Sequence, residues 1–497
     1  MTTNQSHPRF VGGMSWADAA TRSDTDILRA LVFAAGLCWS VVFVVVGLRY
    51  ELQLYGDGAM FSYSVAVRDA WAFHWHNISG RLSVYLFCLA PAEAYVGLTG
   101  NPSGGIAVYG FLFFAAQILG LAAAFRSDRS KGRIIFSYAC FSTACFCPLV
   151  FGFPTEMWIA HALFWPALAV CHYGRRGIGG TALVFGILLA LIFTHEGAIV
   201  LAVVILATLL LRGMRHPAFL RAAGALFVAM AIWAAVKAAL PPDDYFADVY
   251  VRAALGFFDD ALLSSRLVLL LLAAIAGYGV VFFVLLQIAP ARAHLYATAI
   301  VTLALAVYWL ALDHGLHAAN RYYMRTVLFT AMPPLGALAA IYALRADGRP
   351  EPLEIFPARV MQVLTGRVAV RAIAGVFLLV MLVHVVETAK FVTQWTKYKT
   401  AVLALATSTV SDPVLGDPHL ISSARIGPEL SRLSWYSTTP YLSVILAGFA
   451  PTRLVVSPRT ANYFWLSCEM ATANLKADRV VPAASRELVR IYSCLHR

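Results

Sequence analysis

A single carboxylate stands between two glycines at Asp57, in the sequence Tyr-Gly-Asp-Gly, a few residues beyond the first long apolar segment. Gly56 and Gly58 free the backbone to present this side chain. In a partly desolvated position at a membrane surface, a carboxylate acquires a raised pKa and can serve as a general base toward a hydroxyl group. The alternative is that Asp57 only forms a turn, because Asp-Gly is a common turn pair.

Further ionisable groups lie in two very short turns between apolar segments. Glu156 starts an apolar segment, where a carboxylate can simply complement the helix dipole. His195 and Glu196 lie side by side between two segments that are short for a bilayer. Charged groups at membrane depth are costly, so they mark either a site or a specific ion pair. These residues are therefore candidates to position a substrate.

Three basic residues are candidates to bind a phosphate. Arg321 and Arg325 share one face of a helix with His317 at i,i+4 spacing, and the planar guanidinium donates two hydrogen bonds at once. Arg81 follows Asp57 in the same loop and is included with them. The alternative for the Arg321 face is an ordinary interfacial anchor. Lys237, inside an apolar segment, must either extend to the surface or meet an anion.

The elements that position these groups are set by composition. The chain has 497 residues, of which 60% are hydrophobic and 13% charged, with a mean hydropathy of +0.72, so its solvent must be the lipid bilayer. We expect an all-α polytopic protein, because a helix satisfies its own backbone in lipid. About eleven spanning segments are predicted, at residues 27–48, 106–125, 134–152, 156–173, 180–194, 198–211, 222–240, 267–289, 295–312, 326–344 and 372–389.

The distribution of Arg and Lys predicts the topology. The basic residues collect in loops on one side, which the positive-inside rule makes cytoplasmic together with residues 1–26, so the net charge of +12 needs no nucleic-acid partner. All these basic loops lie on one side only if residues 82–98 do not cross the membrane. Because that segment is short and contains Pro91, we expect a helix along the outer interface, within one large external loop at 49–105. An Arg- and Ala-rich composition indicates a bacterial inner membrane.

The composition changes beyond Lys390, at the end of the transmembrane domain predicted for residues 27–389. Residues 390–497 are predicted to form a small extracytoplasmic α/β or α+β domain, with helical periodicity at 398–407 and 439–449 and a strand at 453–457. Cys468 and Cys494 both lie in this part of the chain, where a disulfide between them is an option. His74 and His76 offer a metal-binding option, against an interfacial aromatic belt as the alternative.

This layout resembles the GT-C class of integral-membrane glycosyltransferases. The resemblance is architectural and covers nearly the whole chain: many helices, a long first external loop with an acidic residue soon after the first helix, and an external C-terminal domain. It implies that Asp57 is the catalytic base. Many members carry a paired acidic motif in that loop, whereas this chain has a single carboxylate between its glycines, so the need for a divalent metal ion stays open.

The resemblance implies a polyprenyl-phosphate-linked sugar as donor and an extracytoplasmic glycan, lipid or protein as acceptor. Asp57 would take the acceptor proton, and we add the interpretation that Arg321 and Arg325 neutralise the departing phosphate while His195 and Glu196 position a substrate. Two other classes remain as alternatives. A non-catalytic assembly or scaffold protein would leave Asp57 as a turn residue, and a transporter would show broken helices near the bilayer midplane.

Overall fold

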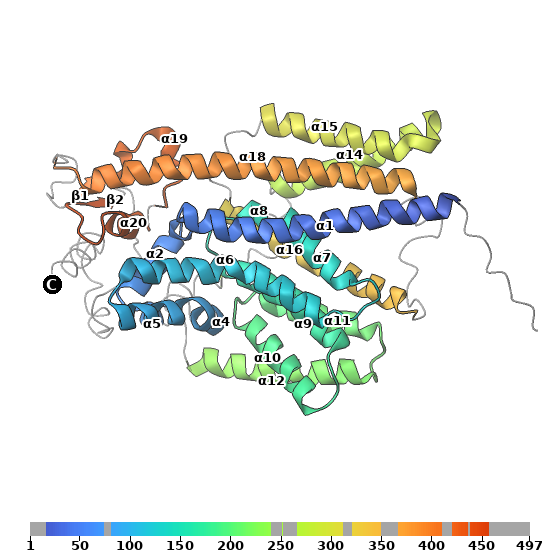
Figure 1. The fold of residues 1–497 in the computed structure, drawn as a ribbon, viewed down its shortest axis with the longest axis horizontal. Helices are drawn as coiled ribbons and strands as arrows, with labels where there is room; N and C mark the ends of the chain where they lie inside the picture. Colours follow the sequence, from blue (N-terminus) through green and yellow to red (C-terminus); the bar gives the residue numbers. More distant parts are fainter. Residues whose placement is uncertain are drawn as a thin grey trace, which may run out of the picture.

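The computed structural model describes residues 16–73, 81–239, 251, 266–311, 321–348, 366–409, 420–435 and 438–456, and these are mostly helical (Figure 1). The bundle contains α1 (Trp16–Arg49), α6 (Pro102–Ser127), α7 (Ile134–Cys145), α8 (Cys147–Val150), α9 (Glu156–Tyr173), α10 (Ile178–Ile192), α11 (Ala198–Leu210), α12 (Pro217–Ala239), α14 (Arg266–Ile288), η4 (Pro290–Arg292), α15 (Ala293–Ala311), α16 (Arg321–Ala346) and α18 (Arg367–Ala406). Shorter elements are η1 (Leu52–Leu54), α2 (Gly58–Ala66), α3 (Ala70–Phe73), α4 (Leu82–Val84), the π-helical η3 (Tyr85–Leu89), α5 (Ala90–Thr99), β1 (Leu420–Ser422), η5 (Ser423–Arg425), α19 (Pro428–Ser431), α20 (Thr439–Leu446) and β2 (Leu454–Val456).

Every segment predicted to span the bilayer contains helix where the structure describes it. Six stretches in the described ranges are helical, long and apolar enough to cross a membrane. These are Asp24–Arg49, Leu82–Thr99, Pro102–Ser127, Pro217–Ala239, Val327–Ala346 and Arg367–Ala406. The other predicted spans form helices that are too short or not apolar enough to be counted with these six. The apolar helices indicate a multi-pass membrane protein, but they do not establish the predicted number of eleven spans.

The basic loops meet at one end of the bundle, which we call the basic end. Asp24 of α1 pairs with Arg367 of α18 at 2.8 Å between the carboxylate oxygen and Nε. Asp347, just beyond α16, accepts hydrogen bonds from the Lys131 backbone N–H (3.0 Å) and from the Tyr173 hydroxyl (2.7 Å). These contacts join loops far apart in sequence, as the predicted topology requires.

Residues 82–99 do not reach the basic end. The Ser83 N–H donates to the Phe193 carbonyl (3.3 Å) at the opposite end of α10, so the segment begins at that level. From there it runs antiparallel to the first half of α6 and joins it through a tight turn (Figure 1). It therefore forms a hairpin with α6, whereas the sequence had predicted a helix lying along the interface. The basic loops stay together, although the segment is apolar enough to span.

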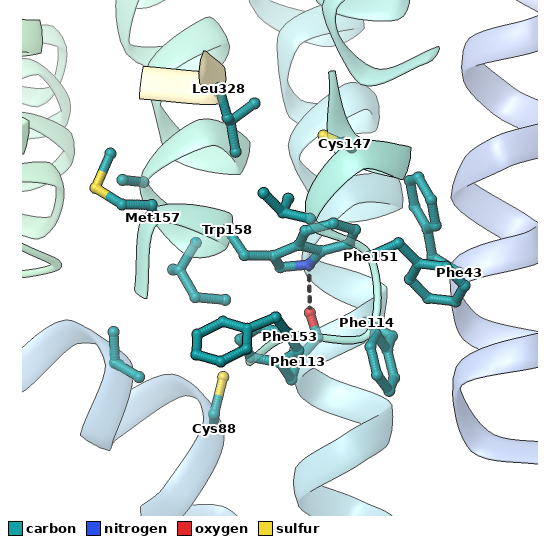
Figure 2. Close-up of a cluster of buried hydrophobic side chains, with 14 of the residues drawn as sticks. Phe43, Cys88, Phe113, Phe114, Cys147, Phe151, Phe153, Met157, Trp158 and Leu328 are labelled. Atoms are coloured by element: carbon teal, nitrogen blue, oxygen red, sulfur yellow. Dashed lines mark hydrogen bonds between the residues drawn. The ribbon is translucent and has the colours of Figure 1, made fainter. Parts of the chain in front are cut away.

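Aromatic packing joins α1, α6 and α9 around Trp158 (Figure 2). The Trp158 ring lies 4.8 Å from that of Phe43 and 5.9 Å from that of Phe113, between ring centroids, and its indole N–H donates to the Phe113 carbonyl at 3.0 Å. At Gly120 the helices α6 and α9 approach so closely that a Cβ would lie 2.4 Å from the Ala162 carbonyl oxygen. Small residues at such crossings permit close backbone packing in membranes.

The long helix α18 continues beyond the domain boundary predicted at residue 390 and ends only at Ala406. The strand expected at 453–457 is present as β2, which pairs in parallel with β1, and the helix expected at 439–449 is present as α20. α20 packs on α2, where the ring centroids of Tyr441 and Tyr63 are 5.3 Å apart. Cys468 and Cys494 lie outside the described residues.

The close approach at Gly120 predicts a sharp difference between two helical glycines. Gly120→Ala should lower stability by roughly 1–3 kcal/mol, because the added methyl group forces α6 from α9. Gly186→Ala in α10 should be neutral or stabilising by up to about 1 kcal/mol, since nothing lies within 4 Å of its Cβ position. Thermal unfolding of both variants in detergent measures the difference. Equal melting temperatures would contradict this helix packing.

Candidate active site

Asp57 lies between η1 and α2, and the two glycines around it set its position. Gly56 has φ +58°, which favours glycine, and a Cβ there would lie 2.5 Å from the Phe153 ring. A Cβ on Gly58 would lie 2.0 Å from the Gln53 carbonyl oxygen. Only glycine fits either position, so the turn that presents Asp57 depends on both, as the sequence predicted.

Asp57 does not act as a capping residue. It immediately precedes α2, but its side chain makes no hydrogen bond to the α2 backbone. Among the described residues its carboxylate accepts no hydrogen bond and forms no ion pair, while part of its surface stays accessible. Asp57 does lie in a turn, which the Gly58 N–H closes onto the Tyr55 carbonyl at 3.1 Å, but its side chain adds no hydrogen bond to the α2 backbone.

Arg81 connects three segments around Asp57. One guanidinium nitrogen lies 2.6 Å from a carboxylate oxygen of Glu156, and the other terminal nitrogen lies 3.1 Å from Glu196. The side chains of Arg81 and Glu156 are only 12% and 8% exposed, so this pair is largely shielded from solvent. Lys237 of α12 pairs with the second oxygen of Glu196 at 3.0 Å. We call Arg81, Glu156, Glu196 and Lys237 the ion-pair network.

The network answers two questions that the sequence left open. Glu156 does begin α9, but it also binds Arg81, so its role is not confined to the helix dipole. Lys237 meets an anion of the protein itself, the carboxylate of Glu196. Sequence reasoning missed this pairing, although a lysine within an apolar helix was the signal that could have found it.

His195 is a neutral hydrogen-bonding group beside this network. Its Nδ1 accepts the Gly197 backbone N–H at 3.0 Å, so the proton of the neutral ring resides on Nε2. Burial and the charge of Arg81 lower its pKa to about 4. The 3.8 Å approach of Nδ1 to Glu196 is therefore not an ion pair at neutral pH. His195 can donate one hydrogen bond from Nε2 and carries no charge.

The electrostatic surroundings of Asp57 suit a general base. Burial and the charge of Glu156 raise the pKa of Asp57 to about 7, and the guanidinium groups of Arg325 and Arg81 act in the opposite direction. Protein atoms surround the carboxylate closely, yet its surface is not fully closed. A carboxyl group that titrates near neutral pH can take a proton from a bound hydroxyl group.

Arg321 and Arg325 have different positions, although they lie one turn apart. Arg321 is buried and donates from Nη1 to the carbonyls of Pro148 (3.0 Å) and Phe151 (2.5 Å), while its Cζ lies 4.0 Å from the Phe391 ring centroid. It therefore ties α16 to the end of α8 and to α18. Arg325 is half-buried and acts electrostatically on Asp57. The structure brings Arg325, not Arg321, to the site.

The described residues do not assemble a metal site. Within the parts of the chain that the structure describes, no His, Cys, Asp or Glu side chains gather in groups of three or more suited to hold an ion. Glu156 and Glu196 are directed at Arg81 and Lys237, which leaves Asp57 as a single ligand. His74, His76 and His317 lie outside the described residues.

The sequence matches no protein-family model, and no curated protein is significantly similar to it.

Removing Arg81 tests the ion-pair network. Arg81→Met removes the ion-pair partner of the shielded Glu156 and leaves Glu196 with Lys237, and it should cost roughly 2–4 kcal/mol of stability. The control Arg371→Met removes a 59% exposed partner of Asp24 at the basic end and should cost less than about 1 kcal/mol. Denaturant unfolding in detergent measures both. The network is not structural if the two variants lose equal stability.

Asp57 should also make stability depend on pH. Its pKa in the folded chain, about 7, lies above the ordinary value of 3.8, so ionisation costs stability as pH rises from about 4 to 7. Asp57→Asn removes this cost, which reaches at most roughly 1.4 kcal/mol per pH unit. The variant should melt higher than the wild type, with a larger gap at pH 8 than at pH 5. An identical gap at both pH values would contradict the raised pKa.

Proposed function

We propose that this chain is a membrane glycosyltransferase of GT-C type that moves a sugar from a polyprenyl-phosphate-linked donor to an extracytoplasmic acceptor. The observation that carries the proposal is the Asp57 carboxylate, which has no ion-pair partner among the described residues and a pKa near 7, in the field of the cationic groups of Arg81 and Arg325. Apolar helices support a multi-pass membrane protein. The choice of this chemistry also relies on architectural analogy.

In the proposed reaction Asp57 accepts the proton of the acceptor hydroxyl group as its oxygen attacks the anomeric carbon. The bond from that carbon to the phosphate oxygen breaks, and its electron pair leaves with the polyprenyl phosphate. The departing phosphate gains negative charge, which Arg325 is placed to neutralise, because its field already reaches the Asp57 carboxylate. His195 donates a hydrogen bond from Nε2 to position a sugar hydroxyl group.

The ion-pair network supplies the setting for this chemistry. The charge of Glu156 raises the pKa of Asp57 and so strengthens it as a base, while Arg81 keeps Glu156 from being an alternative proton acceptor. Glu196 holds Lys237 and Arg81 in place. We place the basic end in the cytoplasm and the Asp57 end outside, in a bacterial inner membrane, by the positive-inside rule.

Asp57→Asn tests the proposal. Membrane vesicles that contain the chain are incubated with polyprenyl-phosphate sugars, using a panel of labelled hexoses, and released polyprenyl phosphate is measured. The variant should lose at least about 100-fold in rate, because a general base contributes 10²–10⁴-fold. The wild-type rate should fall as pH drops below about 7, where Asp57 becomes protonated.

Asp26→Asn is the matched control, since Asp26 is exposed at the other end of α1. It should keep the wild-type rate and pH profile. The glycosyltransferase proposal is overturned if no donor in the panel releases polyprenyl phosphate, or if Asp57→Asn retains full activity. The latter result would favour a scaffold protein in which Asp57 has no chemical role.

A further inference from the structure

A basic cavity of about 300 Å³ lies at the basic end, away from Asp57. It is lined by the turn between α9 and α10 and the turn between α11 and α12. Among the residues that the structure describes, no acidic one lines it. Its polar lining includes Arg176, Arg212, Arg221, His172 and His216.

The guanidinium group of Arg221 is only partly used by the described residues. Arg221 donates from Nη1 to the Arg175 carbonyl at 2.6 Å, while its Nε is buried and has no hydrogen-bond partner among the described residues. A buried donor without a partner costs free energy unless a ligand or water satisfies it. Arg176 lines the same cavity with an exposed side chain. This is the pattern of a site that awaits an anion.

A buried hydrogen-bond chain fixes the orientation of Arg212. The Thr208 hydroxyl donates to the Ile205 carbonyl (2.7 Å), so its oxygen accepts from His172 Nε2 (2.9 Å). His172 Nδ1 then accepts from Arg212 Nε at 3.3 Å. The Arg212 guanidinium also lies 5.2 Å from the Tyr173 ring centroid. Its direction is therefore set before any ligand binds, which favours affinity.

The carboxylate that contacts the lining is already engaged. Asp347 accepts hydrogen bonds from the Tyr173 hydroxyl and the Lys131 backbone, on the outer side of Tyr173. It does not line the cavity. Asp347 therefore does not occupy the cavity, and the exposed Arg176 and the buried Nε of Arg221 can meet an external anion.

We propose that this cavity binds an ionised phosphate group. Arginine recognises phosphate through its fork of donors, and basic pockets between helices on this side of a membrane bind phospholipid headgroups. An anionic phospholipid is favoured over a free phosphate, because exposed apolar residues adjoin the lining residues in the sequence. Ile178, Met214 and Leu220 adjoin lining residues and are 92%, 70% and 58% exposed, where they can contact acyl chains.

Native mass spectrometry of the full chain tests the site, with phosphatidylglycerol, phosphatidylcholine and inorganic phosphate as separate probes. The wild type should prefer phosphatidylglycerol over phosphatidylcholine. Combined Arg176→Gln, Arg212→Gln and Arg221→Gln substitutions should weaken phosphatidylglycerol binding at least about tenfold. The matched control is Arg215→Gln, an exposed arginine of the same turn outside the cavity lining, which should bind as the wild type does.

If the triple variant fails to fold, Arg176→Gln alone tests the site, because the Arg176 side chain is exposed and its loss should not disturb folding. This single substitution should weaken phosphatidylglycerol binding about threefold. Displacement of bound phosphatidylglycerol by millimolar inorganic phosphate would identify a free phosphate as an occupant, and no displacement would identify the lipid. Either result supports a phosphate site. If the cavity variants and Arg215→Gln bind phosphatidylglycerol equally well, the phosphate-site proposal is overturned. This result does not depend on the activity of Asp57→Asn.

Discussion

The guanidinium of Arg81 lies between two carboxylates from distant parts of the chain, and the site depends on this contact. It joins the start of α4 to the first turn of α9 through Glu156 and to the α10–α11 turn through Glu196. Where solvent is largely excluded, an ion pair costs desolvation free energy, so each charge must be compensated by its partner. Lys237 completes the compensation of Glu196 and adds α12. These charges pair with one another, and Asp57 has no ion-pair partner among the residues that the structure describes.

The helices could be predicted because lipid leaves the backbone little choice. Each apolar stretch must satisfy its own N–H and C=O groups, so hydropathy alone locates helices. The boundary at Lys390 could not be found in this way. α18 changes there from an apolar to an amphipathic helix, and its buried residues continue at helical spacing, at Phe391, Trp395, Tyr398, Val402 and Ala406. The change of composition at Lys390 therefore marks a change in the character of α18, from apolar to amphipathic, and not the end of that helix.

Local sequence was sufficient to nominate the site residues but not to pair them. Asp57 stood out by its glycines, and His195 and Glu196 by their cost in an apolar setting. The separation of Arg321 from Arg325 depends on a remote feature, the carbonyls of Pro148 and Phe151 where α8 ends. Those carbonyls need donors, and only the tertiary fold shows that Arg321 supplies them. Equal helical spacing had made the two arginines look equivalent.

The two ends of α1 show why Asp57 is suited to chemistry. Asp24, at one end, is bound by Arg367 and Arg371, whose side chains are 51% and 59% exposed, in pairs that solvent weakens and that cost little to keep. Asp57 lies in the turn before α2, beyond the other end of α1, where protein surrounds it and it carries the cost of desolvation without a direct partner among the described residues. An uncharged residue would avoid this cost. The proposed role as a general base is the role that uses the proton affinity of such a carboxylate.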